Sequence, residues 1–241
     1  MNSRPAVVGR IRTRLLVNAL VDPDEAAPRL PAGLRPHVTA RGTVVGCCLL
    51  QLEQVRPAGC PPWLGIGLRA AAHRISVEWD DAVGERAVGV YVPERLTDSR
   101  LAVVAGGRWF PGVHRSAEVE VRRFTGELTW SVVADGDAIA VRTISMDRSG
   151  PASDDQVVGA TCLGADVGFS PNRRGMLEGV QMRPDHRDAQ RVVTDACTST
   201  FLASFRTAVP APAYLMESVG VTWTPYPRTL VPQIATAAPR V

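Results

Sequence analysis

The 241-residue chain has an ordinary globular composition, with 45% apolar residues, 21% charged residues and a formal net charge of +3. These values exclude wholesale disorder. All 27 basic residues are arginine, so the N-terminus is the only aliphatic primary amine. Both lysine Schiff-base chemistry and a phosphate-binding loop that needs lysine are therefore excluded.

Charge and cysteine patterns narrow the possible partners. The arginines are scattered among acidic residues without interleaved aromatics, which argues against nucleic-acid binding. Apolar runs are too short to span a membrane, and the patch at 15–17 is too short for a signal peptide. The five cysteines form no C-x-x-C pair, and no disulfide framework or metal site is expected. We expect a cytoplasmic protein with no cofactor and no membrane partner.

Residues 11–21 alternate loosely between apolar and polar types and predict the first strand. The next segment begins with Asp22, Pro23 and Glu25, which suit the N-cap, the first helical position and the capping-box position of a short helix. That helix is expected to end before Pro31.

The alternation of apolar and polar residues that is typical of a strand recurs several times in the first half of the chain. Further strands are predicted at 44–55, 73–79, 87–92 and 114–121, with a short helix at 98–105. In the strand at 73–79, His73 shares a face with Ile75, Val77 and Trp79. We therefore expect the His73 side chain to point inward.

The clearest local signal in the second half is a hairpin. Strands at 127–134 and 137–145 flank the turn Asp135-Gly136. After it, we expect a helix from Ser153 to about Leu163, an extended proline-rich tail from about 224, and strands at 176–182, 192–204 and 214–223. The whole pattern predicts one mainly β domain over 1–241, an antiparallel, closed or nearly closed β-barrel with a few short helices.

A family pattern is present in two neighbouring segments, LLVNALVDPDEAAPRLPAGLRP and the strand after it, VVGCCLLQLEQVRP. It is also present in the segments AAHRISVEW, GVYVPERLTDSRL and AGGRWFPGVHRSAEV. The first pair resembles the opening of the acetoacetate decarboxylase-like superfamily, and the later segments resemble a lysine-less branch of it. The resemblance covers about residues 10–123 and implies an acetoacetate decarboxylase-like β-barrel.

Decarboxylases of that superfamily form a Schiff base through a buried lysine, with an arginine and glutamates lining the cavity. By the resemblance, Arg12 takes the place of that arginine, and Cys47 takes a glutamate position. Arg115 and Ser116 stand where the lysine pair is expected. Neither side chain can form an imine, so the resemblance implies the fold without the Schiff-base mechanism.

Two histidines and three arginines are the candidate site residues. His114 and His73 can act as general acid or base, because an unperturbed imidazole titrates near neutrality. Arg12, Arg108 and Arg115 can hold a carboxylate or a developing enolate. Each has a plainer interpretation: Arg12 on a solvated strand face, His73 as a hydrogen-bonded core residue, and the others in a strand connection.

The leading hypothesis is an enzyme that acts on a keto-acid or β-dicarbonyl-like compound by Arg/His electrostatic and acid–base catalysis. The reaction would be a decarboxylation, an enolisation, or a cyclisation or dehydration in secondary metabolism. One alternative is a barrel that binds or senses a small ligand without chemistry, and another is a subunit whose filled barrel serves only assembly. The expected partner is a small organic acid or carbonyl compound. Exposed strand edges favour a homo-oligomer in each case.

Overall fold

The computed structural model describes residues 4–81, 83–108, 110–146 and 153–227, with the side chains of 144–146 and 153–157 excepted. Its strands are β1 (Val7–Val21), β2 (Arg35–Pro36), β3 (Val38–Thr39), β4 (Gly42–Pro57), β5 (Ile66–Asp80), β6 (Arg86–Tyr91), β7 (Arg95–Thr97), β8 (His114–Ser116), β9 (Glu118–Phe124), β10 (Glu127–Ala134), β11 (Asp137–Met146), β12 (Val167–Pro171), β13 (Leu177–Pro184), β14 (Gln190–Ser199) and β15 (Val209–Pro225). The helices are α1 (Pro23–Ala26), α2 (Arg100–Ala105), α3 (Ser153–Gly164) and α4 (Thr200–Ala203). Within this described part of the chain, no helix has the length and apolar content needed to cross a lipid bilayer.

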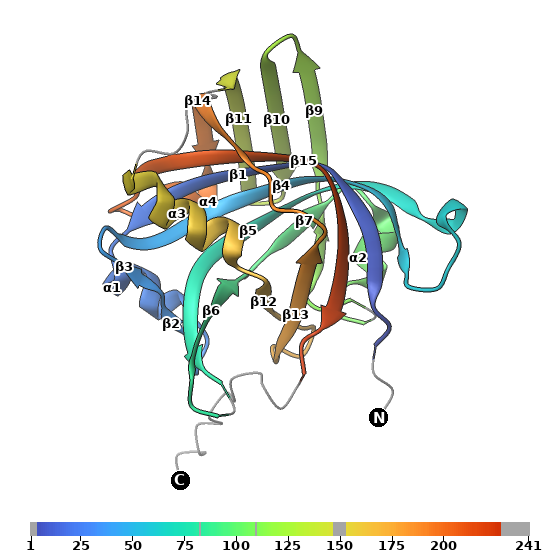
Figure 1. Cartoon of the computed structure of the whole chain (residues 1–241), viewed down its shortest axis with the longest axis horizontal. Helices are drawn as coiled ribbons and strands as arrows, with labels where there is room; N and C mark the ends of the chain where they lie inside the picture. Colours follow the sequence, from blue (N-terminus) through green and yellow to red (C-terminus); the bar gives the residue numbers. More distant parts are fainter. Residues whose placement is uncertain (1–3, 82, 109, 147–152, 228–241) are drawn as a thin grey trace.

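Seven strands close into a barrel. They follow the order β1-β4-β5-β6-β12-β13-β15, and β15 pairs back with β1. Every pairing along this circuit is antiparallel except β6 with β12, which is parallel and only two residue pairs long. The mainly β, closed-barrel fold predicted from the sequence is confirmed (Figure 1).

The short parallel contact depends on a glycine. A Cβ atom at Gly89 of β6 would lie 2.4 Å from the Val167 carbonyl oxygen of β12. Only a residue without a side chain allows this approach, so Gly89 lets the two strands meet and the barrel close.

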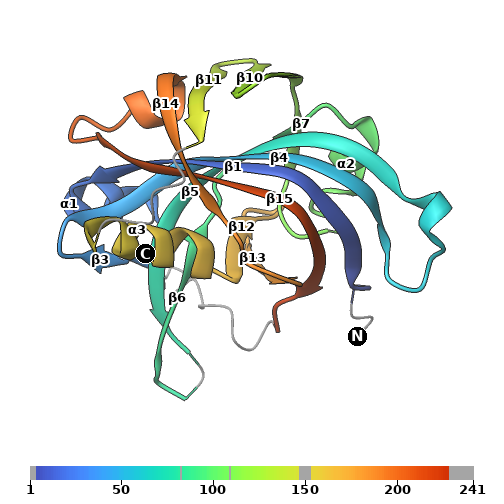
Figure 2. The same ribbon diagram turned by 45° about the horizontal axis from the view of Figure 1, so that its top comes forward.

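A second layer of strands continues from the barrel. The N-terminal part of β15 pairs with β14, and the order then runs β14-β11-β10-β9. Figures 1 and 2 show these strands above the barrel. Trp130 of β10, which is fully buried, packs in one apolar cluster with Leu15 of β1 and Leu49 of β4. The second layer therefore covers the outer face of β1, β4 and β5.

The barrel interior holds the opposite set of side chains. Leu16 of β1, Cys48 of β4, Val90 of β6 and Tyr214 of β15 share one cluster with Cys162 of α3. Side chains from strands around a closed barrel meet in this way only inside it. Helix α3, gold in Figure 2, therefore lies against the interior.

The first helix begins as predicted, but its capping box does not form. Asp22 accepts a hydrogen bond from the Asp24 N–H at 2.9 Å. The Asp22 N–H, which Glu25 was expected to cap, donates instead to the Thr207 hydroxyl at 2.9 Å. Glu25 accepts from the backbone N–H groups of Arg206 and Thr207, and ties α1 to the segment before β15. Its pKa falls to about 2, chiefly through the Thr207 hydroxyl.

The second half of the chain differs from the prediction mainly at one element. The expected strand at 192–204 ends at Ser199, whose hydroxyl accepts from the Leu202 N–H and begins helix α4. Strand β12 was not predicted at all. Strand β15 continues to Pro225, and most of the proline-rich tail lies outside the described residues.

Candidate functional site

Two arginines lie inside the barrel with almost no solvent contact. Arg14 of β1 is 5% exposed and Arg74 of β5 is 6% exposed. Arg14 approaches two sulfur atoms, Cys48 Sγ at 3.4 Å and Met216 Sδ at 3.7 Å. Arg74 donates to Asn18 Oδ1 at 3.5 Å, while its Nε has no hydrogen-bond partner among the residues that the structure describes.

Among the side chains that the structure describes, no Asp or Glu forms an ion pair with Arg14 or Arg74. Burial raises the pKa of the neighbouring Cys162 thiol, so a thiolate does not supply the charge. A buried charge without a partner is unfavourable. A bound anion would relieve that cost.

Arg95 extends the positive region, and His114 lies beside it. They face each other in the parallel ladder of β7 and β8, and Arg95 donates to the Ser170 hydroxyl at 3.0 Å. Arg95 is partly accessible, yet desolvation by the surrounding protein lowers its pKa to about 10. Burial, and then the charge of Arg95, lowers the pKa of His114 to about 3. His114 is therefore neutral at physiological pH, and its Nδ1 lacks a hydrogen-bond partner among the described residues.

The described residues enclose one small cavity beside Arg74. This cavity of ≈ 10 Å³ adjoins Arg74, Ser76 and Cys162, with Val44, Val45, Gly46, Val90 and Thr161 completing its wall. That volume holds about one water molecule.

Arg12 does not point into the barrel, although it stands two residues from Arg14. Its side chain is 62% exposed and pairs with Glu53 at 3.1 Å. The register of β1 against β4 shifts between Ile11 and Thr13. This irregularity interrupts the alternation that would have placed Arg12 and Arg14 on one face.

The structure does not bring the other predicted site residues into one place. Arg108 is exposed in the turn after α2. Arg115 donates to the Glu94 carboxylate and to the Asp135 carbonyl oxygen, outside the barrel interior. Of the predicted set, His114 alone lies beside the interior arginines, next to Arg95.

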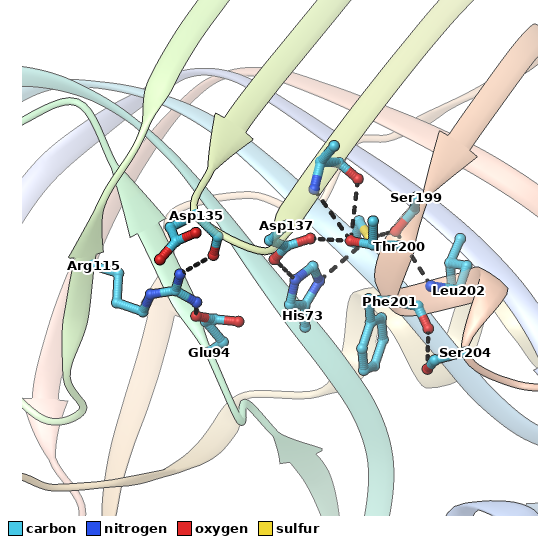
Figure 3. Close-up of polar contacts among 12 residues, drawn as sticks. His73, Glu94, Arg115, Asp135, Asp137, Ser199, Thr200, Phe201, Leu202 and Ser204 are labelled. Carbon is cyan, nitrogen blue, oxygen red and sulfur yellow. Dashed lines mark hydrogen bonds and ion pairs between the residues drawn. The ribbon is translucent and has the colours of Figure 1, made fainter.

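His73 belongs to a second polar cluster, between the barrel and the second layer (Figure 3). The side chain points outward from the barrel, is buried, and stacks on Phe201 with the ring centroids 4.4 Å apart. Its Nε2 contacts Asp137, which also accepts a hydrogen bond from the Thr200 hydroxyl. Its Nδ1 lies 3.6 Å from Cys47 Sγ.

Comparisons with known proteins give solved structures only, since no family model and no curated protein matches the chain. Acetoacetate decarboxylase from Legionella pneumophila has 13% identity and a TM-score of 0.61, over 94% of this chain and 88% of that one. An acetoacetate decarboxylase-like enzyme from Sphingomonas wittichii RW1 has 14% identity and a TM-score of 0.62, over 94% of each chain. The enduracididine biosynthesis enzyme MppR, complexed with the condensation product of pyruvate and imidazole 4-carboxaldehyde, has 12% identity and a TM-score of 0.62, over 94% and 89%.

This chain has the acetoacetate decarboxylase-like fold. The resemblance drawn from its sequence motifs is thereby confirmed for the fold. The acetoacetate decarboxylase-like barrel of this chain contains no lysine, so its interior cannot form an imine through a side chain.

The outward cluster of this barrel has the chain of contacts of a cysteine nucleophile, a base and an orienting acid. Burial argues against that use. Cys47 is 1% exposed, and desolvation raises its pKa to about 12. A nearby groove of ≈ 570 Å³ is lined by Ser199 and Thr200 but not by Cys47. Cys47 is therefore an unreactive thiol without substrate access.

Sequence reasoning missed the arginines that the acetoacetate decarboxylase-like barrel gathers inside. Arg14 lies in line with Leu16 and Asn18, and this alternation was the available signal for it. Arg74 alternates with His73 on a strand that is buried on both faces, so periodicity alone could not assign the inner face. The sequence favours Arg95 as half of a surface ion pair with Glu94, although the resemblance places that segment at the border of the cavity.

Proposed function

We propose that this acetoacetate decarboxylase-like barrel binds a small organic acid in its interior and acts on a keto-acid or β-dicarbonyl-like compound without a covalent imine. The burial of Arg14 and Arg74 without a described carboxylate partner carries the proposal. A carboxylate would provide the counter-charge, and the planar guanidinium is suited to bind it in a bidentate manner.

The interior groups divide the chemistry between them. Arg14 and Arg74 hold the carboxylate. Arg95 stabilises the enolate that forms when a carbonyl compound loses carbon dioxide, or a proton, from the adjacent carbon. The electron pair of the broken bond passes into the enolate, and His114 exchanges the proton at that carbon. The negative charge of the bound acid raises the pKa of His114 from its low value.

The remaining expectations stay part of the proposal. Arg14, Arg74 and Arg95 replace Arg12, Arg108 and Arg115 as the anion-holding residues, and His114 is kept while His73 is not. All five cysteines are free thiols, which is consistent with a reducing cytoplasm. The edge strand β9 offers a surface for a homo-oligomer.

One observation favours the alternative of a binding barrel without chemistry. His114 has a pKa of about 3, far from the range in which a general acid or base works efficiently. Unless a bound anion raises this pKa, the interior holds a ligand and does not move its protons. Binding and turnover must therefore be measured separately.

The test is thermal unfolding of the full chain with small keto, hydroxy and dicarboxylic acids, and with neutral compounds of equal size. A ligand at a hundred times its Kd adds about 2.7 kcal/mol, which raises the Tm by roughly 5–10 °C for a domain of this size. We expect the response from acids only. Arg14→Met should weaken acid binding by about 10–100-fold, because it removes a charged hydrogen-bond donor worth about 1.5–3 kcal/mol.

Arg12→Met is the matched control, because it removes the same charge from the same strand outside the barrel. It should bind acids like the wild type. Arg14→Met should also have a higher Tm without ligand, since a buried unpaired charge is gone. Acid binding that survives Arg14→Met but not Arg12→Met would overturn the proposal.

Measurements of turnover distinguish the enzyme hypothesis from the hypothesis of a barrel that only binds its ligand. For acids that bind, we would measure carbon dioxide release and deuterium uptake from D2O at the carbon next to the carbonyl. The enzyme hypothesis expects at least one of these, with loss in His114→Gln at unchanged acid affinity. Acid binding without either reaction would establish the binding barrel.

A further inference from the structure

We propose that His73, Glu94 and Asp137 bind a divalent transition-metal cation at the junction of the barrel and the second layer. The inference does not depend on acid binding inside the barrel, because these side chains lie on the other face of β5. It assigns a role to the polar cluster that the proposed reaction leaves unused.

Three separate segments bring the donor atoms together. His73 lies in the middle of β5, Glu94 directly precedes β7, and Asp137 is the first residue of β11. One imidazole nitrogen and one oxygen from each carboxylate all lie within 4.8 Å of one another. The three side chains converge in Figure 3, although 21 residues or more separate them in sequence.

Each carboxylate ligand also accepts a hydrogen bond from a second side chain. Asp137 accepts from the Thr200 hydroxyl, and Glu94 accepts from the Arg115 guanidinium. Such outer contacts orient metal ligands and are a regular feature of metal sites.

The imidazole is oriented in the same way. The His73 ring stacks on Phe201, and its Nδ1 lies 3.6 Å from Cys47 Sγ. At this distance the Cys47 sulfur can accept the Nδ1 hydrogen. With a cation bound, that tautomer would let the Nε2 lone pair coordinate the metal in place of the present contact with Asp137.

Charge and burial favour a cation at this point. The side chains of His73 and Asp137 are 4% and 6% exposed, while Glu94 is 25% exposed. Two carboxylates meet here, and Arg115 offsets only one of them. A divalent cation would take the place of the direct contact between His73 and Asp137, entering on the more open Glu94 side.

The donor set selects the kind of metal. One imidazole and two carboxylates suit Zn²⁺ and neighbouring first-row cations, whereas Mg²⁺ and Ca²⁺ prefer oxygen ligands alone. Three protein ligands leave a coordination position for water. The site would fasten the β10–β11 hairpin to β5 and present a Lewis acid between the barrel and the second layer.

The test is Zn²⁺ titration of the chelator-treated full chain by calorimetry, with metal content measured by elemental analysis. We expect one Zn²⁺ per chain. Glu94→Gln should weaken binding by more than about 100-fold, because loss of an outer contact alone costs about 10–100-fold. Glu94 is the variant of choice, since its partial exposure spares the core, and circular dichroism would verify the fold.

Arg115→Gln is the matched control. It breaks the same Glu94–Arg115 ion pair but keeps the metal ligand, so its Zn²⁺ affinity should fall by no more than the roughly 10–100-fold that loss of an outer contact costs. His186, beside Asp185 and Asp188, is an exposed competitor for zinc, and His186→Gln should leave binding unchanged. A Co²⁺-loaded sample should lack thiolate-to-metal absorption.

Three results would overturn the metal site. The first is no stoichiometric Zn²⁺ binding, and the second is equal weakening by Glu94→Gln and Arg115→Gln. The third is loss of binding in His186→Gln alone, which would place the zinc at the exposed histidine.

Discussion

Because the pKa of His114 is low in the folded protein, this one side chain should make the free energy of unfolding depend on pH. Its pKa is about 3 in the folded protein, against 6.5 for the unperturbed group, so the unfolded chain binds more protons between these values. The contribution to stability is complete above pH 6.5. It is lost as the pH falls from 6.5 to 3, by at most about 1.4 kcal/mol per pH unit.

His114→Gln should therefore flatten the pH dependence of the unfolding free energy in this window. The measurement is chemical denaturation of both proteins between pH 7 and pH 4. His186→Gln, which changes a more exposed histidine, should retain the wild-type slope. Parallel curves for wild type and His114→Gln would show that His114 is accessible to protons in the folded state.

For single residues, the sequence predicts which residue types could serve a function better than it predicts which way their side chains point. Alternation correctly placed a strand at 11–21, but it could not reveal the register shift between Ile11 and Thr13 that separates Arg12 from Arg14. Such an irregularity depends on hydrogen bonding to β4, a neighbour that local periodicity does not describe. His73 shows the same limit, because both faces of its strand are buried.

For strands and helices, the local sequence was sufficient for a correct prediction where a turn sets the pairing of the two strands that flank it. The hairpin around Asp135-Gly136 forms as predicted, because the two strands adjoin the turn that sets their register. Strands β2, β7 and β8 are two or three residues long and form only through partners that are distant in sequence. Helix α4 interrupts a β-rich run, because the Ser199 hydroxyl caps a helical turn there.

Gly136→Ala tests the hairpin turn. Gly136 has a φ of 73°, and no atom lies within 4 Å of the position that an added methyl group would take, so the substitution adds backbone strain and no clash. We expect a loss of about 1 kcal/mol in the free energy of unfolding, measured by denaturant titration. Gly164→Ala, at the end of α3 in open space without a positive φ, should be neutral or stabilising. Equal effects of the two changes would refute the turn assignment.

On the scale of the whole molecule, the second layer and the barrel share one apolar core. Trp130 is fully buried between them, whereas Phe124 at the end of β9 is 72% exposed. Trp130→Ala should therefore cost about 3–5 kcal/mol and lower the Tm by roughly 10 °C. Phe124→Ala should change stability by less than about 0.5 kcal/mol.

Calorimetry would report both values. A separate low-temperature transition in Trp130→Ala, with the main transition unmoved, would show that the layers unfold independently. The sequence could not predict this arrangement, because the inner and outer faces of the barrel strands are both apolar. Only closure of the sheet decides which face meets α3 and which meets Trp130.

The pairing of β1 with β15 joins Val7 to Trp223. During synthesis on the ribosome, the first strand emerges long before its final partner exists. At about 5–20 residues per second, the delay is on the order of 10–40 s. Strand β1 can pair with β4 in that time, but its other edge stays open until the last strand arrives. Nascent chains of this protein should therefore depend on chaperones that shield an exposed strand edge.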